Sequence, residues 1–96
     1  MELTIEKTTK TTETIQIEFP IFKKLFNDYY AFYSETKIVA VWEIEYMDGE
    51  KYYSIRNTSS DKTLSEVMFN ELTTSITEDE FNSVRKAAMD YINAIN

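Results

Sequence analysis

The sequence predicts a single α+β domain over residues 1–96, with an antiparallel β-sheet of about five strands packed against one or two C-terminal helices. Three observations predict this fold. β-branched and aromatic residues alternate with polar residues over much of the chain up to Asn57. Asp48-Gly49, a strong hairpin signal, separates two of these runs. From Glu78 onward, apolar residues recur with the spacing of a helix.

The composition is that of a packed, acidic domain. Hydrophobic residues make up 43% of the chain and aromatic residues 15%, and 17 acidic against 10 basic side chains give a net charge of -7. A chain of this size buries enough surface to form a core without disulfides, and the absence of cysteine fits a reducing compartment. No signal-peptide pattern and no membrane-spanning apolar run is present. We therefore expect a cytoplasmic protein that does not associate with membranes.

The N-terminal region predicts two strands. In the second, Ile15, Ile17 and Phe19 alternate with polar residues as in a half-buried strand, and Pro20 ends it. The Thr-rich stretch between the two strands lacks Asn and Gly, so it does not indicate a tight hairpin. Residues 21–28 leave two alternatives open, one helical turn or a hairpin that reverses at Asn27-Asp28.

The central hairpins predict a strand register. A two-residue turn at Asp48-Gly49 pairs Trp42 with Ile55 in antiparallel strands. A second two-residue turn at Glu35-Thr36 pairs Tyr29 with Trp42. The register assigns side chains to the two faces of the sheet.

The two predicted faces differ in polarity. One is apolar and predicts the core face; it carries Tyr29, Ala31, Tyr33, Ile38, Ala40, Trp42, Ile44, Tyr53 and Ile55. The second face is half apolar and half charged; it carries Tyr30, Phe32, Val39, Val41 and Tyr52, with Glu43, Glu45, Ser54 and Arg56 toward one end. The strand from Lys37 to Tyr46 is thus apolar on both sides only over its first half. We expect the second face to be covered over that half alone.

Two helix starts carry capping-box spacing. Thr63 to Glu66 predicts the start of a short helix, and Thr77 to Glu80 the start of the last helix, with Ile76 and Phe81 as a hydrophobic staple. The run from Leu72 to Ile76 predicts a short edge strand. Residues 63–96 hold six acidic and two basic side chains. Three of the six acids, Glu78, Asp79 and Glu80, lie in the first turn of the last helix and form a candidate acidic site.

The absent residue types limit the possible chemistry. The chain has no histidine and no cysteine, which removes the usual general base, the common metal ligands and Ser/His or Cys/His nucleophiles. Glu43 and Glu45, two apart on one strand, are a candidate carboxylate pair for acid-base work or for a divalent cation. Asp28 with Glu35 and Lys37 has the order of the acids and lysine in metal-dependent nucleases. Ordinary solvated charges explain both groups better, so we predict no catalytic residues, no metal site and no cofactor.

The second sheet face is the candidate site for a partner. Its aromatic residues resemble the stacking platforms of single-strand binders, but those platforms are surrounded by basic side chains, whereas Glu43 and Glu45 lie beside these. The net charge opposes direct nucleic-acid binding. Either the face is buried beneath the N-terminal strands, or it is exposed and binds a protein. The candidate partner-binding residues are Tyr30, Phe32, Val39, Val41, Tyr52, Glu43 and Glu45.

Two segments carry a resemblance. Tyr33-Ser34-Glu35-Thr36-Lys37 with the β-rich run after it, and the stretch Ile76-Thr77-Glu78-Asp79-Glu80-Phe81-Asn82, resemble small uncharacterised accessory proteins of bacterial viruses and mobile elements. The resemblance covers about half of the chain and has no catalytic signature. It implies a class of short acidic proteins, some of which bind and inhibit host proteins.

These observations predict a non-enzymatic protein-protein interaction module, a small acidic inhibitor or accessory protein that binds a host protein or itself. The first alternative is a nucleic-acid mimic, whose carboxylates occupy the binding cleft of a DNA- or RNA-binding protein. The second is a divalent-metal-dependent hydrolase that uses the strand carboxylates.

Overall fold

The computed structural model describes residues 2–6, 12–58 and 61–95, and it has the predicted α+β fold. The main sheet has five antiparallel strands in the order β6-β5-β4-β3-β7. A separate two-stranded sheet joins β1 and β2. In chain order the elements are β1 (Glu2–Glu6), β2 (Thr12–Gln16), β3 (Ile21–Leu25), β4 (Asp28–Phe32), β5 (Ile38–Glu45), β6 (Lys51–Thr58), α1 (Asp61–Met68), β7 (Thr74–Ser75) and α2 (Glu78–Ile95).

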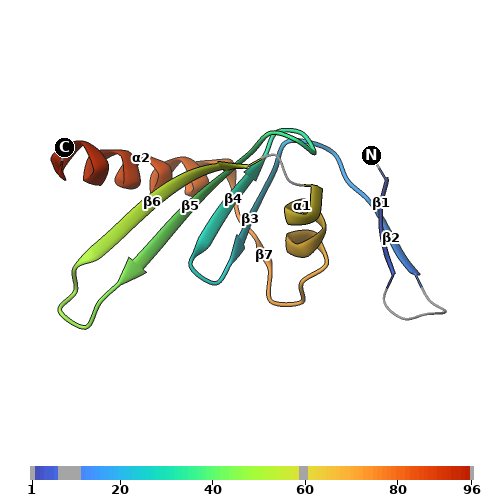
Figure 1. Ribbon diagram of the computed structural model, residues 1–96, viewed down its shortest axis with the longest axis horizontal. Coiled ribbons are helices and arrows are strands. Elements are labelled where there is room, and N and C mark those ends of the chain that lie inside the picture. Colours follow the sequence, from blue (N-terminus) through green and yellow to red (C-terminus); the bar gives the residue numbers. More distant parts are fainter. Residues whose placement is uncertain (1, 7–11, 59–60, 96) are drawn as a thin grey trace.

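The main sheet lies between the two helices (Figure 1). We call the face toward α1 the front face and the face toward α2 the back face. The β5–β6 hairpin extends well past the β3–β4 hairpin, because β5 and β6 have eight residues each whereas β3 and β4 have five. The β1–β2 sheet lies at the other side of α1, away from β6.

The first part of the chain follows the predictions in part. Two N-terminal strands form, but the second ends at Gln16, so the prediction that it continues through Ile17 and Phe19 to Pro20 is wrong. The predicted lack of a tight turn between them concerns residues 7–11, which lie outside the described residues. Residues 21–28 form a hairpin rather than a helical turn, with Leu25 paired to Asp28. The predicted edge strand is confirmed as β7, which pairs with β3.

The predicted register of the β5–β6 hairpin is wrong by one residue. The Tyr46 N–H donates to the Glu50 carbonyl at 2.9 Å, so the connection has three residues instead of two. Gly49 takes a φ of 84° there, as three-residue hairpin loops require of their last residue. The Asp48 carboxylate accepts from the Glu50 N–H at 2.9 Å and holds the loop. Trp42 consequently pairs with Ser54.

The β4–β5 register is wrong for the same reason. The Tyr33 N–H donates to the Lys37 carbonyl at 2.9 Å, which again leaves three residues in the loop. The Ser34 hydroxyl accepts from the Lys37 N–H at 3.0 Å and stabilises the longer connection. Asp28, not Tyr29, therefore pairs with Trp42.

A shift of one residue moves every side chain of a strand to the other face of the sheet. Relative to the predicted faces, β5 is reversed against both of its neighbours. The front face carries Tyr30, Phe32, Ile38, Ala40, Trp42, Ile44, Tyr52, Ser54 and Arg56. The back face carries Tyr29, Ala31, Val39, Val41, Glu43, Tyr53 and Ile55. Neither predicted face survives intact.

The two helix starts differ in outcome. α1 begins at Asp61, so Thr63 lies inside the helix and the prediction that it caps the helix is wrong. Asp61 and Lys62 are themselves helical, because neither residue opposes a helix as Gly or Pro does. α2 begins at Glu78 as predicted, and the Thr77 hydroxyl accepts from the Glu80 N–H at 3.1 Å. No helix in the described parts of the chain is long and apolar enough to cross a membrane.

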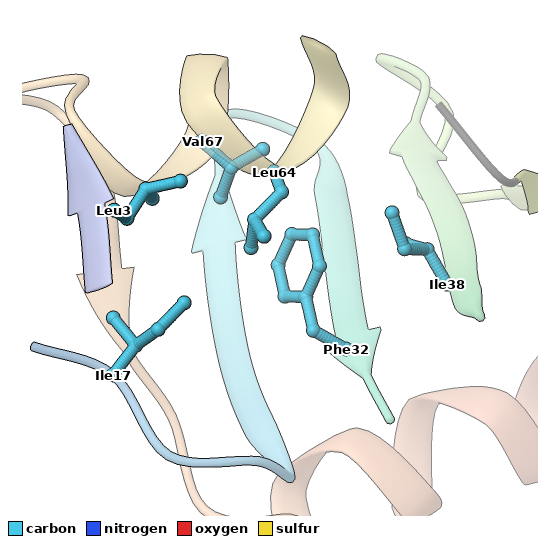
Figure 2. Packing of buried hydrophobic residues seen from close by; sticks show 6 residues of the cluster. All are labelled: Leu3, Ile17, Phe32, Ile38, Leu64 and Val67. Carbon is cyan, nitrogen blue, oxygen red and sulfur yellow. The ribbon is translucent and has the colours of Figure 1, made fainter. Parts of the chain in front are cut away.

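Each helix closes one hydrophobic core. On the back face, α2 packs against the middle of the sheet, and the buried residues are Ala31, Val39, Val41, Phe81, Val84 and Ala88. On the front face, α1 packs over β3 and β4, and β5, β1 and the residue after β2 each contribute a buried side chain to the cluster (Figure 2). The buried residues of this second cluster are Leu3, Ile17, Phe32, Ile38, Leu64 and Val67. The front core therefore connects the small sheet to the large one through α1.

The front core gives a test of the fold. Leu64 is 1% exposed and lies between Phe32 and Val67. Leu64→Ala should lower the free energy of unfolding by about 2–5 kcal/mol, because it removes buried methyl groups and leaves a cavity. Leu72→Ala is the matched control, since Leu72 is 62% exposed and its truncation should change stability by less than about 0.5 kcal/mol. Urea unfolding monitored by circular dichroism measures both; equal effects would contradict this packing.

Candidate functional site

The structure divides the predicted partner-binding residues between the two faces. Tyr30, Phe32 and Tyr52 lie on the front face, as a group. Val39 and Val41 lie on the back face, where α2 buries them. Phe32 is also fully buried, beneath α1. Of the five apolar candidates only Tyr52 is exposed, at 36%, so the predicted patch does not exist as one surface.

Glu43 and Glu45 lie on the back face, away from the front-facing Arg56 that was expected beside Glu43. Arg56 forms an ion pair with Asp28 instead, at 3.1 Å. Glu43 lines an open groove of about 540 Å³ between the sheet and the start of α2, together with Lys51, Asp79 and Glu80. This groove brings one strand carboxylate next to two of the predicted acidic helix-start residues, a convergence that sequence reasoning did not foresee.

Burial raises the pKa of Tyr53, which also lines this groove, and a hydrogen bond to Glu43 raises that pKa further. Glu78, the third acid of the helix start, does not line the groove. Acidic residues in a first turn are explained by the helix dipole alone. The groove is therefore polar and acidic, but Lys51 offsets part of its charge.

The nuclease-like order of Asp28, Glu35 and Lys37 does not form a site. Asp28 begins β4, whereas Glu35 lies in the loop after its other end. A strand rises about 3.3 Å per residue, so the two carboxylates are roughly 20 Å apart. Within residues 2–6, 12–58 and 61–95, no three acidic side chains gather as metal ligands would.

The uncovered part of the front face is a different surface from the predicted one. α1 covers the front face around Tyr30, Phe32 and Ile38. Past that point, near the β5–β6 loop, large apolar side chains have no covering element among the described residues. We define the front surface as Trp42, Ile44, Tyr46, Met47 and Tyr52.

Exposure is highest at the end of the front surface. Met47 is fully exposed at 106% of its reference area, and Tyr46 is 53% exposed. Trp42 and Ile44 are partly buried by their neighbours on the sheet but belong to neither hydrophobic core. Sequence reasoning assigned both of them to the core face and passed over Tyr46 and Met47. The unequal strand lengths were the available signal, because a hairpin longer than its neighbours must extend past them.

Tyrosine rings form a row around the free side of β6. The rings of Tyr46 and Tyr52 meet edge to face with centroids 4.8 Å apart. Tyr91 of α2 contacts both the front-facing Tyr52, at 6.0 Å, and the back-facing Tyr53, at 5.8 Å. Because adjacent residues of β6 point to opposite faces, a ring that contacts both must lie beside the strand. Tyr91 therefore covers part of the edge that β6 leaves unpaired.

Three concavities follow one another on the front face. One of about 440 Å³ lies at the end of the front surface, lined by Tyr46, Met47, Asp48 and Tyr52. A second, of about 330 Å³, lies over the ion pair and is lined by Asp28, Trp42, Ser54 and Arg56. A third, of about 450 Å³, reaches beneath α1 and shares Arg56 with the second. In the third, burial raises the pKa of Tyr30, and the charge of nearby Asp28 raises it further.

Tyr52 provides a pH test of the front surface. Its hydroxyl donates to the Glu50 carboxylate at 3.2 Å, and this bond raises the pKa of Tyr52 above its ordinary value of 10.0 because it stabilises the neutral phenol. Glu50→Gln should lower the pKa of Tyr52 toward that ordinary value. Glu45→Gln, the removal of an exposed carboxylate on the other face, should leave it unchanged. A pH titration of tyrosine ring carbons by NMR measures both; an unchanged Tyr52 midpoint in Glu50→Gln would show that this bond is absent in solution.

Comparison with known proteins adds no relative to this geometry. No family model, no curated protein and no solved structure matches the chain. The resemblance to viral accessory proteins therefore stays a prediction. The front surface and the acidic groove are the two features of the fold that bear on function.

Proposed function

We propose that this domain is a non-enzymatic interaction module that binds a protein through the front surface. The observation that carries the proposal is the uncovered end of the sheet, where Trp42 and Ile44 lie outside both cores and Met47 is fully exposed. Folding gains nothing from exposing such side chains together. Contiguous exposed apolar residues mark interaction sites in single-domain proteins.

The side chains of the front surface suit a protein interface. Trp and Tyr are enriched among the residues that dominate binding energy, and methionine adapts to irregular partner surfaces. The contact between Tyr46 and Tyr52 holds both rings before a partner arrives. Rings that are already ordered lose less conformational entropy on binding, so more of the contact energy contributes to affinity.

We expect the partner to dock on the sheet face rather than to add a strand to β6. Strand addition needs a row of free backbone groups along an edge. Tyr91 lies beside β6 at Tyr52 and Tyr53 and obstructs that row. Face docking leaves the row of tyrosines in place.

Charge favours a protein partner over a nucleic acid. Asp48 and Glu50 flank the exposed end of the front surface, and the chain as a whole carries a net charge of -7. The local carboxylates and the overall negative charge both repel the phosphates of a nucleic acid. A partner with a basic border around an apolar pocket complements this surface. In keeping with the accessory-protein resemblance, we expect a cytoplasmic host protein whose activity is inhibited by binding.

The acidic groove supports a second candidate function, nucleic-acid mimicry. Glu43, Asp79 and Glu80 line one groove, as carboxylates that replace phosphates in a partner's cleft would. Such binding depends on charge, so affinity for the partner should fall steeply between 50 mM and 500 mM salt. If Trp42→Ala weakens binding and added salt does not, the interaction belongs to the front surface and not to the acidic groove.

A site-specific cross-linker tests the leading proposal. A photoreactive amino acid at Met47 should capture one predominant protein in cells of the source organism, identified by mass spectrometry. The same group at Lys86, which is exposed on α2, is the control and should not capture that protein. A product of twice 11.3 kDa would identify the partner as a second copy of this chain. Equal capture from positions 47 and 86, or no capture from position 47, would contradict the proposal.

Truncation of the central side chain gives the energetic test. With the captured protein purified, Trp42→Ala should weaken binding at least tenfold, because aromatic residues at the centre of an interface cost about 2 kcal/mol or more when truncated. Isothermal titration calorimetry measures the affinity. Met89→Ala on α2, where Met89 is 47% exposed, is the matched control and should bind like the wild type.

A further inference from the structure

Phe26 occupies a backbone conformation that a phenylalanine rarely takes. Leu25 pairs with Asp28, so Phe26 and Asn27 are the two central residues of the β3–β4 turn. Phe26 has a φ of 55° and is the one residue other than glycine with positive φ in the described parts of the chain. A two-residue hairpin turn with positive φ at its first central position takes glycine there, because a side chain at that position is strained.

The Phe26 side chain makes no core contacts among the described residues that would offset this strain. The Phe26 side chain is 67% exposed and belongs to neither hydrophobic core. Within the described residues its ring pairs with no other aromatic ring. A glycine at this position would relieve the strain and would also remove an exposed apolar ring. The phenylalanine therefore needs a reason outside the stability of the free protein.

Phe26 is held next to the front surface. The carbonyl of Asn27 accepts a hydrogen bond from the Glu43 N–H at 3.0 Å, which fastens the turn to β5. The next residue, Asp28, pairs with Trp42. The turn thus continues the β4–β5 ladder beside the residues that carry the proposed function. A fastened turn presents its ring in a preset position, which reduces the entropy lost on binding.

A second exposed apolar side chain lies on the other side of the turn. Leu72 is 62% exposed and belongs to the loop before β7. Thr74 pairs with Lys24, so this loop runs beside the end of β3 that leads to Phe26. The β3–β4 turn and this loop end at the same side of the sheet (Figure 1).

We propose that Phe26 is an anchor residue that inserts into an apolar pocket of the protein bound by the front surface. This inference rests on the proposed function and adds a specific contact to it. The interface then extends from Met47 across Trp42 to Phe26. Binding energy from burial of the ring offsets the backbone strain that the free protein retains.

A protein pocket fits this anchor better than a lipid surface does. Acidic side chains lie near the exposed apolar tips: Asp48 beside Met47, Glu71 beside Leu72, and Asp28 two residues after Phe26. Anionic headgroups repel such neighbours, and the net charge of -7 adds to the repulsion. Lys23 and Lys24 precede Phe26, but both are engaged within the fold: Lys23 Nζ donates to the Ser75 hydroxyl at 2.7 Å, and Lys24 Nζ lies 5.0 Å from the centroid of the Tyr29 ring.

The strain is tested by stability alone. Phe26→Gly should raise the melting temperature by about 4 °C, because glycine adopts positive φ without steric conflict. Phe26→Ala is the matched control, since it removes the ring but keeps a Cβ in the strained conformation; it should melt close to the wild type. A Phe26→Gly variant that is no more stable than Phe26→Ala would show that no strain is stored and would overturn the inference.

The anchor role is tested by cross-linking and affinity. The photoreactive phenylalanine derivative p-benzoylphenylalanine at position 26 should capture the same protein as the group at Met47. With that protein purified, Phe26→Gly should bind at least tenfold more weakly although it is more stable, whereas Phe26→Tyr, which keeps a ring, should bind within threefold of the wild type. Unchanged affinity of Phe26→Gly overturns the anchor.

The possible outcomes separate the two proposals. Capture from Met47 with unchanged affinity of Phe26→Gly would support binding through the front surface and would contradict the proposal that Phe26 is an anchor. Capture from position 26 without capture from Met47 would contradict both proposals, because the anchor is proposed to contact the protein that the front surface binds. Sedimentation of the wild type, but not of Phe26→Gly, with vesicles of phosphatidylcholine and phosphatidylserine would assign Phe26 to a membrane and would overturn the anchor as proposed.

Discussion

The rest of the structure depends on the burial of β5 on both faces over its first half. Ile38 and Ala40 are buried against the front of the sheet, and Val39 and Val41 against the back. A strand that is apolar on both sides needs a covering layer on each. α2 supplies the back layer, and α1 with the N-terminal strands supplies the front layer.

The two hydrophobic cores cover only one end of the sheet and leave the end near the β5–β6 loop uncovered on its front face. Beyond Val41 no described element covers the front of β5, and the β5–β6 hairpin extends past its neighbours. The exposed aromatic and apolar side chains gather at this end, and the strained turn at Phe26 is fastened to it. Functional residues tend to lie in segments that core packing constrains little and that a rigid scaffold holds in position. The well-packed half of the sheet holds the open half in shape.

The unpaired edge of β6 is partly protected against strand pairing with other chains. An eight-residue edge strand with exposed backbone groups would recruit other chains. Tyr91 lies beside that edge and contacts tyrosines of both faces, and the net charge of -7 adds electrostatic repulsion between copies of the chain. With this edge partly covered, the open front face is the surface on which we propose that a partner docks.

The sequence by itself determined the fold class, most of the elements and the start of α2, because capping, periodicity and turn signals are local. Thr77 caps its helix whatever the rest of the chain does. The faces of the sheet were decided only by tertiary structure. Each of two loops holds one residue more than its turn signal indicated, and a shift of one residue reverses a whole strand. Trp42 and Ile44 therefore moved from a predicted core to an open surface, and Val39 and Val41 moved beneath a helix. Loop length in this sheet depends on side-chain contacts such as those of Ser34 and Asp48, and on which register buries β5 best.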